Sequence, residues 1–127
     1  MPDKIRWGII STGFIASQFA TGLSVIPEAE LVAVASRTAA AADEFGDKFD
    51  VPRRYASYEA LANDPEVDVI YIGTPHPYHY QHTLLCLDAG KHVLVEKPLA
   101  TTIEECEAIL KTRDEKGVKL MVDFQNR

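Results

Sequence analysis

A glutamate, a lysine and a proline end an apolar run of the sequence, at Glu96, Lys97 and Pro98. Residues 92–95 before them are His-Val-Leu-Val, a composition typical of a buried strand. The Lys97 ammonium is a compact, mobile donor that could hydrogen-bond a substrate hydroxyl or carbonyl oxygen as a hydride leaves or arrives. Alternatively, Lys97 pairs with Glu96 or another carboxylate at the surface. The residues alone leave both interpretations open.

A second candidate segment is Gly-Ile-Ile-Ser-Thr-Gly-Phe-Ile-Ala at residues 8–16, between a strand-like run and a helix-like run. It approximates the dinucleotide fingerprint G-x-G-x-x-G/A, with Ser11, Gly13 and Ala16 in the three small-residue positions. In that fingerprint the free N–H groups of a helix N-terminus bind a pyrophosphate. The alternative is an ordinary strand-to-helix turn without a ligand.

The residues after the second predicted strand indicate which nucleotide would bind. An NAD site usually has an acid about 20 residues after the fingerprint, whereas an NADP site often has an arginine for the 2′-phosphate. This sequence has Ser36, Arg37 and Thr38 there, without an acid. A guanidinium binds phosphate through paired hydrogen bonds, and the two hydroxyls can add others. We therefore predict NADP, with NAD possible; the competing interpretation is that Arg37 is a solvated residue at a helix start.

Three histidines, His76, His79 and His82, follow the fourth predicted strand. No cysteine or carboxylate accompanies them at metal-ligand spacing, and two flanking prolines place His76 in an extended turn rather than on the helix of the other two. We therefore predict no metal site. We expect His76 and His79 near the nicotinamide half of the cofactor and His82 in a structural or solvent-facing position.

The candidate segments are positioned by strands that alternate with helices. The predicted strands are Ile5–Ile10, Leu31–Ala35, Arg54–Tyr55, Val67–Gly73, Val93–Glu96 and Leu120–Phe124. The predicted helices are Phe14–Ile26, Thr38 (cap) to Phe49, Ser57 (cap) to Ala62, His79–Ala89, and a helix from the capping box Thr102–Glu105 to Gly117. This alternation predicts an α/β fold, a doubly wound parallel sheet in one domain over residues 1–127, with ligands outside the carboxyl ends of the strands.

Composition and charge restrict the class of protein. The 127 residues are 46% hydrophobic and 25% charged, which is typical of a globular domain. A net charge of -6 without a basic stripe argues against nucleic acid as a partner. Cys86 and Cys106 lack Cys-x-x-Cys spacing and are expected in the core, and there is neither a leader nor an apolar run of the ~18–20 residues that cross a membrane. We expect a soluble protein of the reducing cytoplasm.

Four segments together resemble the N-terminal domain of the Gfo/Idh/MocA oxidoreductases. They are the turn 8–16, Thr-Pro-His-Pro-Tyr-His at 74–79, Ala-Gly-Lys-His-Val-Leu-Val-Glu-Lys-Pro at 89–98, and Leu-Met-Val-Asp-Phe-Gln-Asn-Arg at 120–127. The resemblance covers essentially the whole chain, and the block 89–98 is its most specific part. It implies an NAD(P)-dependent dehydrogenase or reductase that acts on a sugar, polyol or related hydroxy or carbonyl compound.

The resemblance also implies residue roles. Lys97 matches the lysine of the family's Glu-Lys-Pro motif, which lines the substrate site beside the nicotinamide, so it is the predicted catalytic residue; the Lys97–Pro98 peptide is expected to be cis. The residues expected to bind the cofactor are Ser11, Thr12, Gly13, Phe14 and Ile15 on the pyrophosphate, Ser36, Arg37 and Thr38 on the adenosine ribose or its phosphate, and Thr74, Pro75, His76, His79, Glu96 and Lys97 on the nicotinamide side.

Members of this family continue into a second domain that supplies most substrate contacts, usually a catalytic histidine, and the oligomer interface. We expect that domain to be absent from this chain, which ends at Arg127, and the chain to bind nucleotide with little turnover of its own. Copies could associate through faces that the second domain would cover. The alternative is a non-catalytic NAD(P)-sensing or binding module, against which the Glu-Lys-Pro block argues. A methyltransferase of related topology would require an acid after the second strand.

Overall fold

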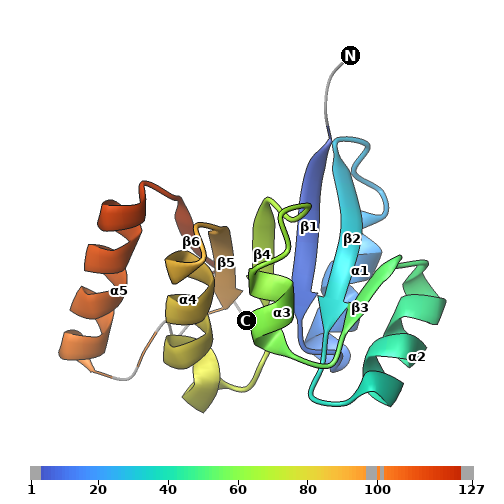
Figure 1. Cartoon of the computed structure of the whole chain (residues 1–127), viewed down its shortest axis with the longest axis horizontal. Helices are drawn as coiled ribbons and strands as arrows, with labels where there is room; N and C mark the ends of the chain where they lie inside the picture. The colour runs from blue at the N-terminus through green and yellow to red at the C-terminus, as the bar shows by residue number, and fades with distance from the viewer. Residues whose placement is uncertain (1–3, 97–99, 101, 124–127) are drawn as a thin grey trace.

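Strands and helices alternate along the computed structural model, which describes residues 4–96, 100 and 102–123 (Figure 1). The strands are β1 (Ile5–Ile10), β2 (Ala29–Ala35), β3 (Arg53–Tyr55), β4 (Val69–Ile72), β5 (His92–Glu96) and β6 (Leu120–Asp123). The α-helices are α1 (Phe14–Leu23), α2 (Ala39–Phe49), α3 (Tyr58–Ala62), α4 (His79–Asp88) and α5 (Ile103–Lys116), and a 3₁₀ turn, η1 (His76–Tyr78), precedes α4.

The strands form one parallel sheet in the order β3-β2-β1-β4-β5-β6. The chain moves outward from β1 to β3, crosses back, and then moves outward in the opposite direction from β4 to β6. The order therefore reverses between β1 and β4, and a crevice forms at their carboxyl ends. The predicted doubly wound α/β fold is confirmed.

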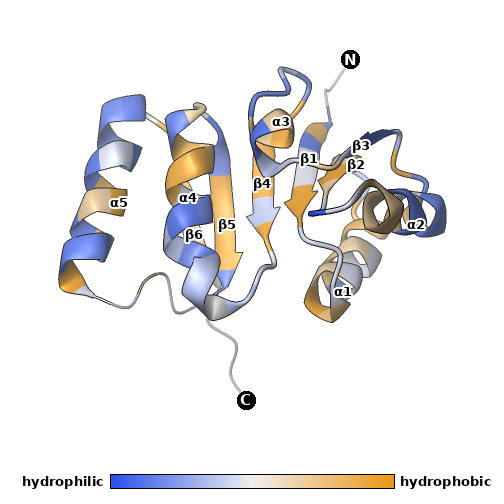
Figure 2. Cartoon of the chain, turned by 60° about the horizontal axis from the view of Figure 1, so that its bottom comes forward, coloured by the Kyte–Doolittle hydropathy of each residue, from blue (hydrophilic) through white to orange (hydrophobic). Residues whose placement is uncertain are grey.

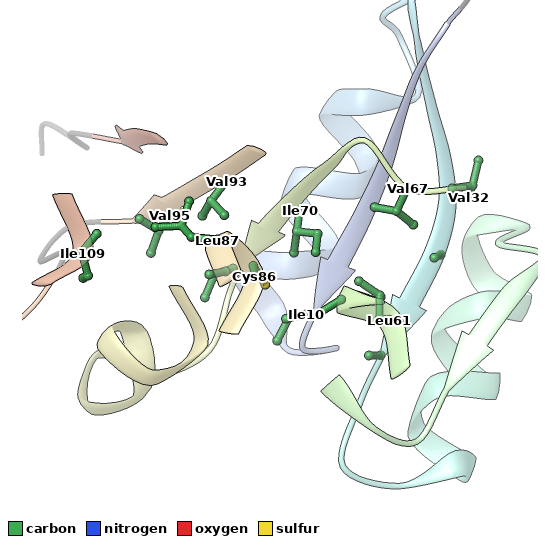
Figure 3. Close-up of a cluster of buried hydrophobic side chains, with 14 residues drawn as sticks. Ile10, Val32, Leu61, Val67, Ile70, Cys86, Leu87, Val93, Val95 and Ile109 are labelled. Atoms are coloured by element: carbon green, nitrogen blue, oxygen red, sulfur yellow. The ribbon is translucent and has the colours of Figure 1, made fainter. Parts of the chain in front are cut away.

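Alternating side chains of the central strands enter two separate cores. Ile9, Val34 and Tyr71 pack with residues of α1 and α2 in one cluster. Ile10 and Ile70, which are their neighbours in sequence, belong to a larger cluster with residues of α3, α4 and α5, drawn in Figure 3. Figure 2 shows the contrast between the hydrophobic middle of β5 and the largely hydrophilic α5. Successive side chains of a strand point to opposite faces of the sheet, so each central strand supplies side chains to the core on either face.

The predicted helix caps are confirmed. The hydroxyls of Thr38, Ser57 and Thr102 accept hydrogen bonds from the backbone N–H three residues later, at 3.1, 3.2 and 3.1 Å. Each bond satisfies a donor that the first turn of a helix leaves unpaired.

Several predicted boundaries are wrong by a few residues. Helix α1 ends at Leu23 rather than Ile26, because the Ser24 hydroxyl donates to Thr21 O at 2.6 Å and the backbone turns toward β2. Strand β4 begins later than predicted, at Val69, because the N–H of Val67 closes the turn after α3. Phe124 lies outside the described residues.

The prediction of an extended turn at His76 is wrong. Residues His76–Tyr78 form the 3₁₀ turn η1, and Tyr78 N donates to Pro75 O at 3.0 Å. Proline is compatible with the first turn of a helix, because its fixed φ is helical and its missing N–H would be unpaired there.

Both cysteines are free thiols, but only one belongs to the core. Cys86 is completely buried, and burial raises the pKa of its thiol to about 12, whereas Cys106 is only half-buried. Within the described ranges, no helix is both long and apolar enough to span a bilayer.

Candidate functional site

A cavity of about 900 Å³ opens at the carboxyl ends of β1, β2, β4 and β5. Cavities of roughly 300–1,000 Å³ are typical of small-molecule sites. The predicted cofactor-binding residues that line it are Ser11, Thr12, Gly13, Phe14, Ile15, Ser36, Arg37, Thr74, Pro75, His79 and Glu96. Segments from four different strand ends therefore meet in one place, at the switch point of the sheet.

Three predicted site residues are not placed in this cavity. The Thr38 hydroxyl accepts from Ala41 N at the start of α2, and Thr38 does not line the cavity. The side chain of His76 and the whole of Lys97 lie outside what the structure describes. The expected cis peptide between Lys97 and Pro98 lies there too.

The cavity has further lining residues that the sequence analysis did not predict: Tyr58, Gly73, Tyr78, Gln81 and His82. A signal for Tyr58 was present, because it follows the end of β3 at the same edge of the sheet. Tyr78, Gln81 and His82, from η1 and α4, carry no such signal, because their approach depends on how α4 packs.

The turn between β1 and α1 has an unusual backbone conformation at Ser11. Its φ is 102°, in the region that favours glycine. Two hydrogen bonds hold it there: Ser11 N donates to Ala35 O at 2.9 Å, and Ser11 Oγ accepts from Gly13 N at 3.3 Å. Ser11 therefore adopts the conformation that a glycine would supply at the first fingerprint position.

Replacing Ser11 with glycine is expected to raise the free energy of unfolding by about 0.5–1 kcal/mol, because relief of a strained φ that costs about 1–3 kcal/mol outweighs the chain entropy that a glycine adds to the unfolded state. Urea unfolding of both proteins measures the change. Ser11→Ala is the comparison, because it keeps the strain and loses the Oγ bond, and should destabilise. A less stable Ser11→Gly protein would contradict the assignment of strain.

The N-terminus of α1 is left open toward the cavity. Helix α1 has no side-chain cap among the described residues and no acid in its first turn, unlike α3 and α5. Gly13 has an ordinary φ of -80°, and an added Cβ would meet only Ser11 Oγ, at 3.8 Å, among non-neighbouring described residues. Neither backbone nor packing requires a glycine here, so the free space fits close approach of a phosphate to the helix N–H groups.

The third small position of the fingerprint serves packing. An added Cβ at Gly73 would lie 3.6 Å from Ala16 Cβ and 3.1 Å from Tyr71 Cε2. Helix α1 and the end of β4 therefore approach closely, as the fingerprint requires of its last small residue.

The β2 side of the cavity carries a cation and hydroxyls. Arg37 is exposed, and the buried Ser36 shares a 3.3 Å hydrogen bond with Thr12 between their hydroxyls. Tyr58 lies close enough to Arg37 to interact with its charge; burial raises the pKa of the Tyr58 phenol, and Arg37 partly opposes that. The β2 side of the cavity could therefore bind phosphate and hydroxyl groups of a ligand.

Two histidines of α4 are fixed by Thr74. His79 is buried with Nε2 2.8 Å from Thr74 O, and His82 Nδ1 is 2.9 Å from Thr74 Oγ1. His82 contacts the rings of Tyr58 and Tyr78, at centroid distances of 4.8 and 5.9 Å. Burial, with a smaller effect of His79, lowers the pKa of the His82 imidazole. His82, which was predicted to be structural or solvent-facing, also lines the cavity.

The opposite end of the cavity carries a carboxylate. Glu96 is the last residue of β5, lines the cavity, and accepts a hydrogen bond from Tyr71 Oη at 2.8 Å. The cavity is thus cationic at β2 and anionic at β5, with the open N-terminus of α1 between them.

Comparison with known proteins gives one consistent result. A family model described as "Oxidoreductase family, NAD-binding Rossmann fold" matches residues 5–124. The trans-1,2-dihydrobenzene-1,2-diol dehydrogenase of Mus musculus is 49% identical over 125 residues, which are 97% of this chain and 38% of that protein. The Bos taurus enzyme of the same name is 47% identical over 119 residues, 92% of this chain and 36% of that protein. The chain therefore spans well under half the length of these curated relatives.

Solved structures agree with the fold. KijD10, a 3-ketoreductase from Actinomadura kijaniata in complex with TDP-benzene and NADP, has a TM-score of 0.91 and 34% identity over 96% of this chain and 39% of its own. The biliverdin reductase from Synechocystis sp. PCC 6803, in complex with biliverdin and NADP+, has a TM-score of 0.85 and 35% identity over 94% of this chain and 37% of its own.

Proposed function

The chain belongs to the Gfo/Idh/MocA oxidoreductase family, which has an NAD-binding Rossmann fold, and we propose that its crevice binds NADP(H) in preference to NAD(H). The observation that carries the preference is Arg37, which lines the same cavity as the open N-terminus of α1 and stands in a segment, residues 36–38, whose sequence contains no acid. The NADP complexes among its structural neighbours support the same nucleotide.

The geometry suggests one orientation of the dinucleotide. The N–H groups of residues 13–15 would bind the pyrophosphate, and Arg37 with Ser36 would bind the adenosine 2′-phosphate. Because β2 and β5 lie on opposite sides of the switch point, the nicotinamide half would extend toward His79 and Glu96. The bound nicotinamide supplies hydride transfer; the protein binds and orients it.

The curated relatives are longer than this chain, and the reaction is proposed for a protein of their length. We propose an NAD(P)-dependent dehydrogenase or reductase for a sugar, polyol or related hydroxy or carbonyl compound, with Lys97 as the donor to the substrate oxygen and a second domain that supplies the remaining substrate contacts and the oligomer interface. The named diol dehydrogenases and 3-ketoreductase support that substrate class. The two free cysteines fit a reducing cytoplasm.

Calorimetric titration with NADPH and NADH, on the chain and on Arg37→Ala, tests the nucleotide preference. We expect NADPH to bind at least about tenfold more tightly than NADH, because charge-assisted hydrogen bonds contribute about 1.5–3 kcal/mol each. Arg37→Ala should remove that difference by weakening NADPH alone.

Arg113→Ala is the control, because Arg113 pairs with Asp114 on α5, away from the cavity. It should leave both affinities unchanged. Equal affinity of the unmodified chain for NADPH and NADH would refute the assignment of Arg37.

A further inference from the structure

A buried phenol on the central strand contacts the carboxylate at the β5 end of the cavity. Tyr71 of β4 is 1% exposed, and its hydroxyl donates to Glu96 Oε2 at 2.8 Å, across 25 residues of sequence. Glu96 lines the cavity, whereas Tyr71 does not. Tyr71 can therefore influence the cavity through the lining residue that it hydrogen-bonds, Glu96.

The Tyr71 ring is fixed in one position. It stacks on Phe19 of α1, with centroids 3.9 Å apart and planes inclined by 4°, and Phe19 in turn meets the edge of Trp7 at 5.3 Å. On another side, a Cβ added at Gly73 would stand 3.1 Å from Tyr71 Cε2. Packing thus locks the rotamer, and a locked hydroxyl gives the Glu96 carboxylate a defined direction.

We propose that Tyr71 is a positioning residue which orients the Glu96 carboxylate, and that the pair sets the preference of the site for oxidised over reduced nucleotide. The inference rests on the proposed function, in which Glu96 lies on the nicotinamide side. The nicotinamide ring of NADP+ carries a positive charge that reduction removes. A carboxylate directed at the ring attracts the oxidised form and has no such attraction for the reduced form. The Tyr71 hydroxyl fixes the direction from which that charge acts.

The test is calorimetric measurement of Kd for NADP+ and for NADPH on the 127-residue chain and its variants. Glu96→Gln should raise the ratio Kd(NADP+)/Kd(NADPH) about tenfold, equivalent to about 30 mV in the potential of the bound two-electron couple. Tyr71→Phe, which keeps the ring, should raise the ratio about threefold by releasing the carboxylate. Because Tyr71 acts through Glu96, the double variant should match Glu96→Gln alone.

Tyr55→Phe is the matched control. Tyr55 Oη also donates to a carboxylate, Asp64 Oδ2, at 2.8 Å, but neither residue lines the cavity. This variant should leave the ratio unchanged.

The outcomes distinguish a failure of this inference from a failure of the proposed function. If Tyr71→Phe weakens both nucleotides by the same factor, Tyr71 is merely structural, and an unchanged ratio in Glu96→Gln overturns the charge argument. A double variant that shifts the ratio by the product of the single shifts overturns the positioning role. An unmodified chain that binds neither nucleotide overturns the proposed function, and this inference with it.

Discussion

Replacing Gly13 with valine is expected to weaken NADPH binding by at least about 100-fold, the equivalent of two lost charge-assisted hydrogen bonds. The branched side chain would fill the space over the N-terminus of α1, where the phosphate is proposed to sit. The free protein should accept it, because Gly13 has φ -80° and ψ -169° and its added Cβ would have no closer non-neighbouring described contact than 3.8 Å. The free energy of unfolding should change by less than about 1 kcal/mol, the preference for glycine over valine at an N-cap.

Gly22→Ala, on the same helix, is the control. An added Cβ at Gly22 would meet nothing within 4 Å among the described residues beyond its chain neighbours and the backbone of its own helix, and Gly22 does not line the cavity. It should stabilise the helix by about 0.5–1 kcal/mol and leave binding unchanged. Calorimetry and urea unfolding together give both quantities. Normal NADPH affinity in Gly13→Val would show that no phosphate occupies the space over Gly13.

Replacing Asp64 with alanine is expected to lower the free energy of unfolding by about 3 kcal/mol or more, because it breaks several hydrogen bonds to a buried charge. Asp64 lies in the segment that connects α3 to β4, and its side chain is completely buried. Its carboxylate accepts from Arg53 Nε at 2.7 Å, Tyr55 Oη at 2.8 Å and Glu66 N at 2.8 Å. Urea unfolding at pH 7 measures the loss.

The stabilisation by Asp64 should disappear in acid. Burial acts to raise the pKa of the Asp64 carboxyl, but the hydrogen bonds from Glu66 N, Arg53 and Tyr55 outweigh burial and lower the pKa below its ordinary value. The contribution is therefore present above the unfolded-state pKa of about 3.9 and is lost as the pH falls through the lower folded-state value.

Unfolding at a series of pH values from 7 to 3 should show the difference between the two proteins shrinking only below about pH 4. Asp114→Ala is the control, because the exposed pair with Arg113 should contribute at most about 0.5 kcal/mol. A constant difference between Asp64→Ala and the unmodified chain down to pH 3 would contradict this account.

The strands and helix starts could be predicted from the sequence because their signals are local. A helix cap joins a hydroxyl to a backbone N–H only three residues later, so it can be predicted locally. The predicted caps at Thr38, Ser57 and Thr102 are all present. The ends of helices and strands were less predictable where a turn can replace the last residues of the element. Helix α1, for example, ends at Leu23, and the Ser24 hydroxyl donates to the carbonyl oxygen of Thr21.

The cavity was predictable as far as strand ends define it. The rule that ligands bind at the carboxyl edge of a parallel sheet identified Ser11, Arg37 and Glu96, which line one cavity. The same rule also predicted Thr38, which does not line the cavity; a hydroxyl at a strand end is also the residue type that caps the next helix. Sequence spacing does not separate these two uses.

The remaining wall depends on tertiary packing. His82 reaches the cavity because α4 lies against α3 and brings the His82 ring onto Tyr58. The Tyr71–Glu96 bond depends on the register of β4 and β5, which pairs Ile72 with Val95. No local pattern predicts a contact between residues so far apart in the chain.

A crystal structure of the chain with NADP+ tests the central claim most directly. The account predicts the pyrophosphate on the N–H groups of residues 13–15, the 2′-phosphate within hydrogen-bond distance of Arg37, and the nicotinamide ring beside Glu96. A dinucleotide bound outside this cavity, or bound in the reverse direction with its adenosine at Glu96, would contradict it.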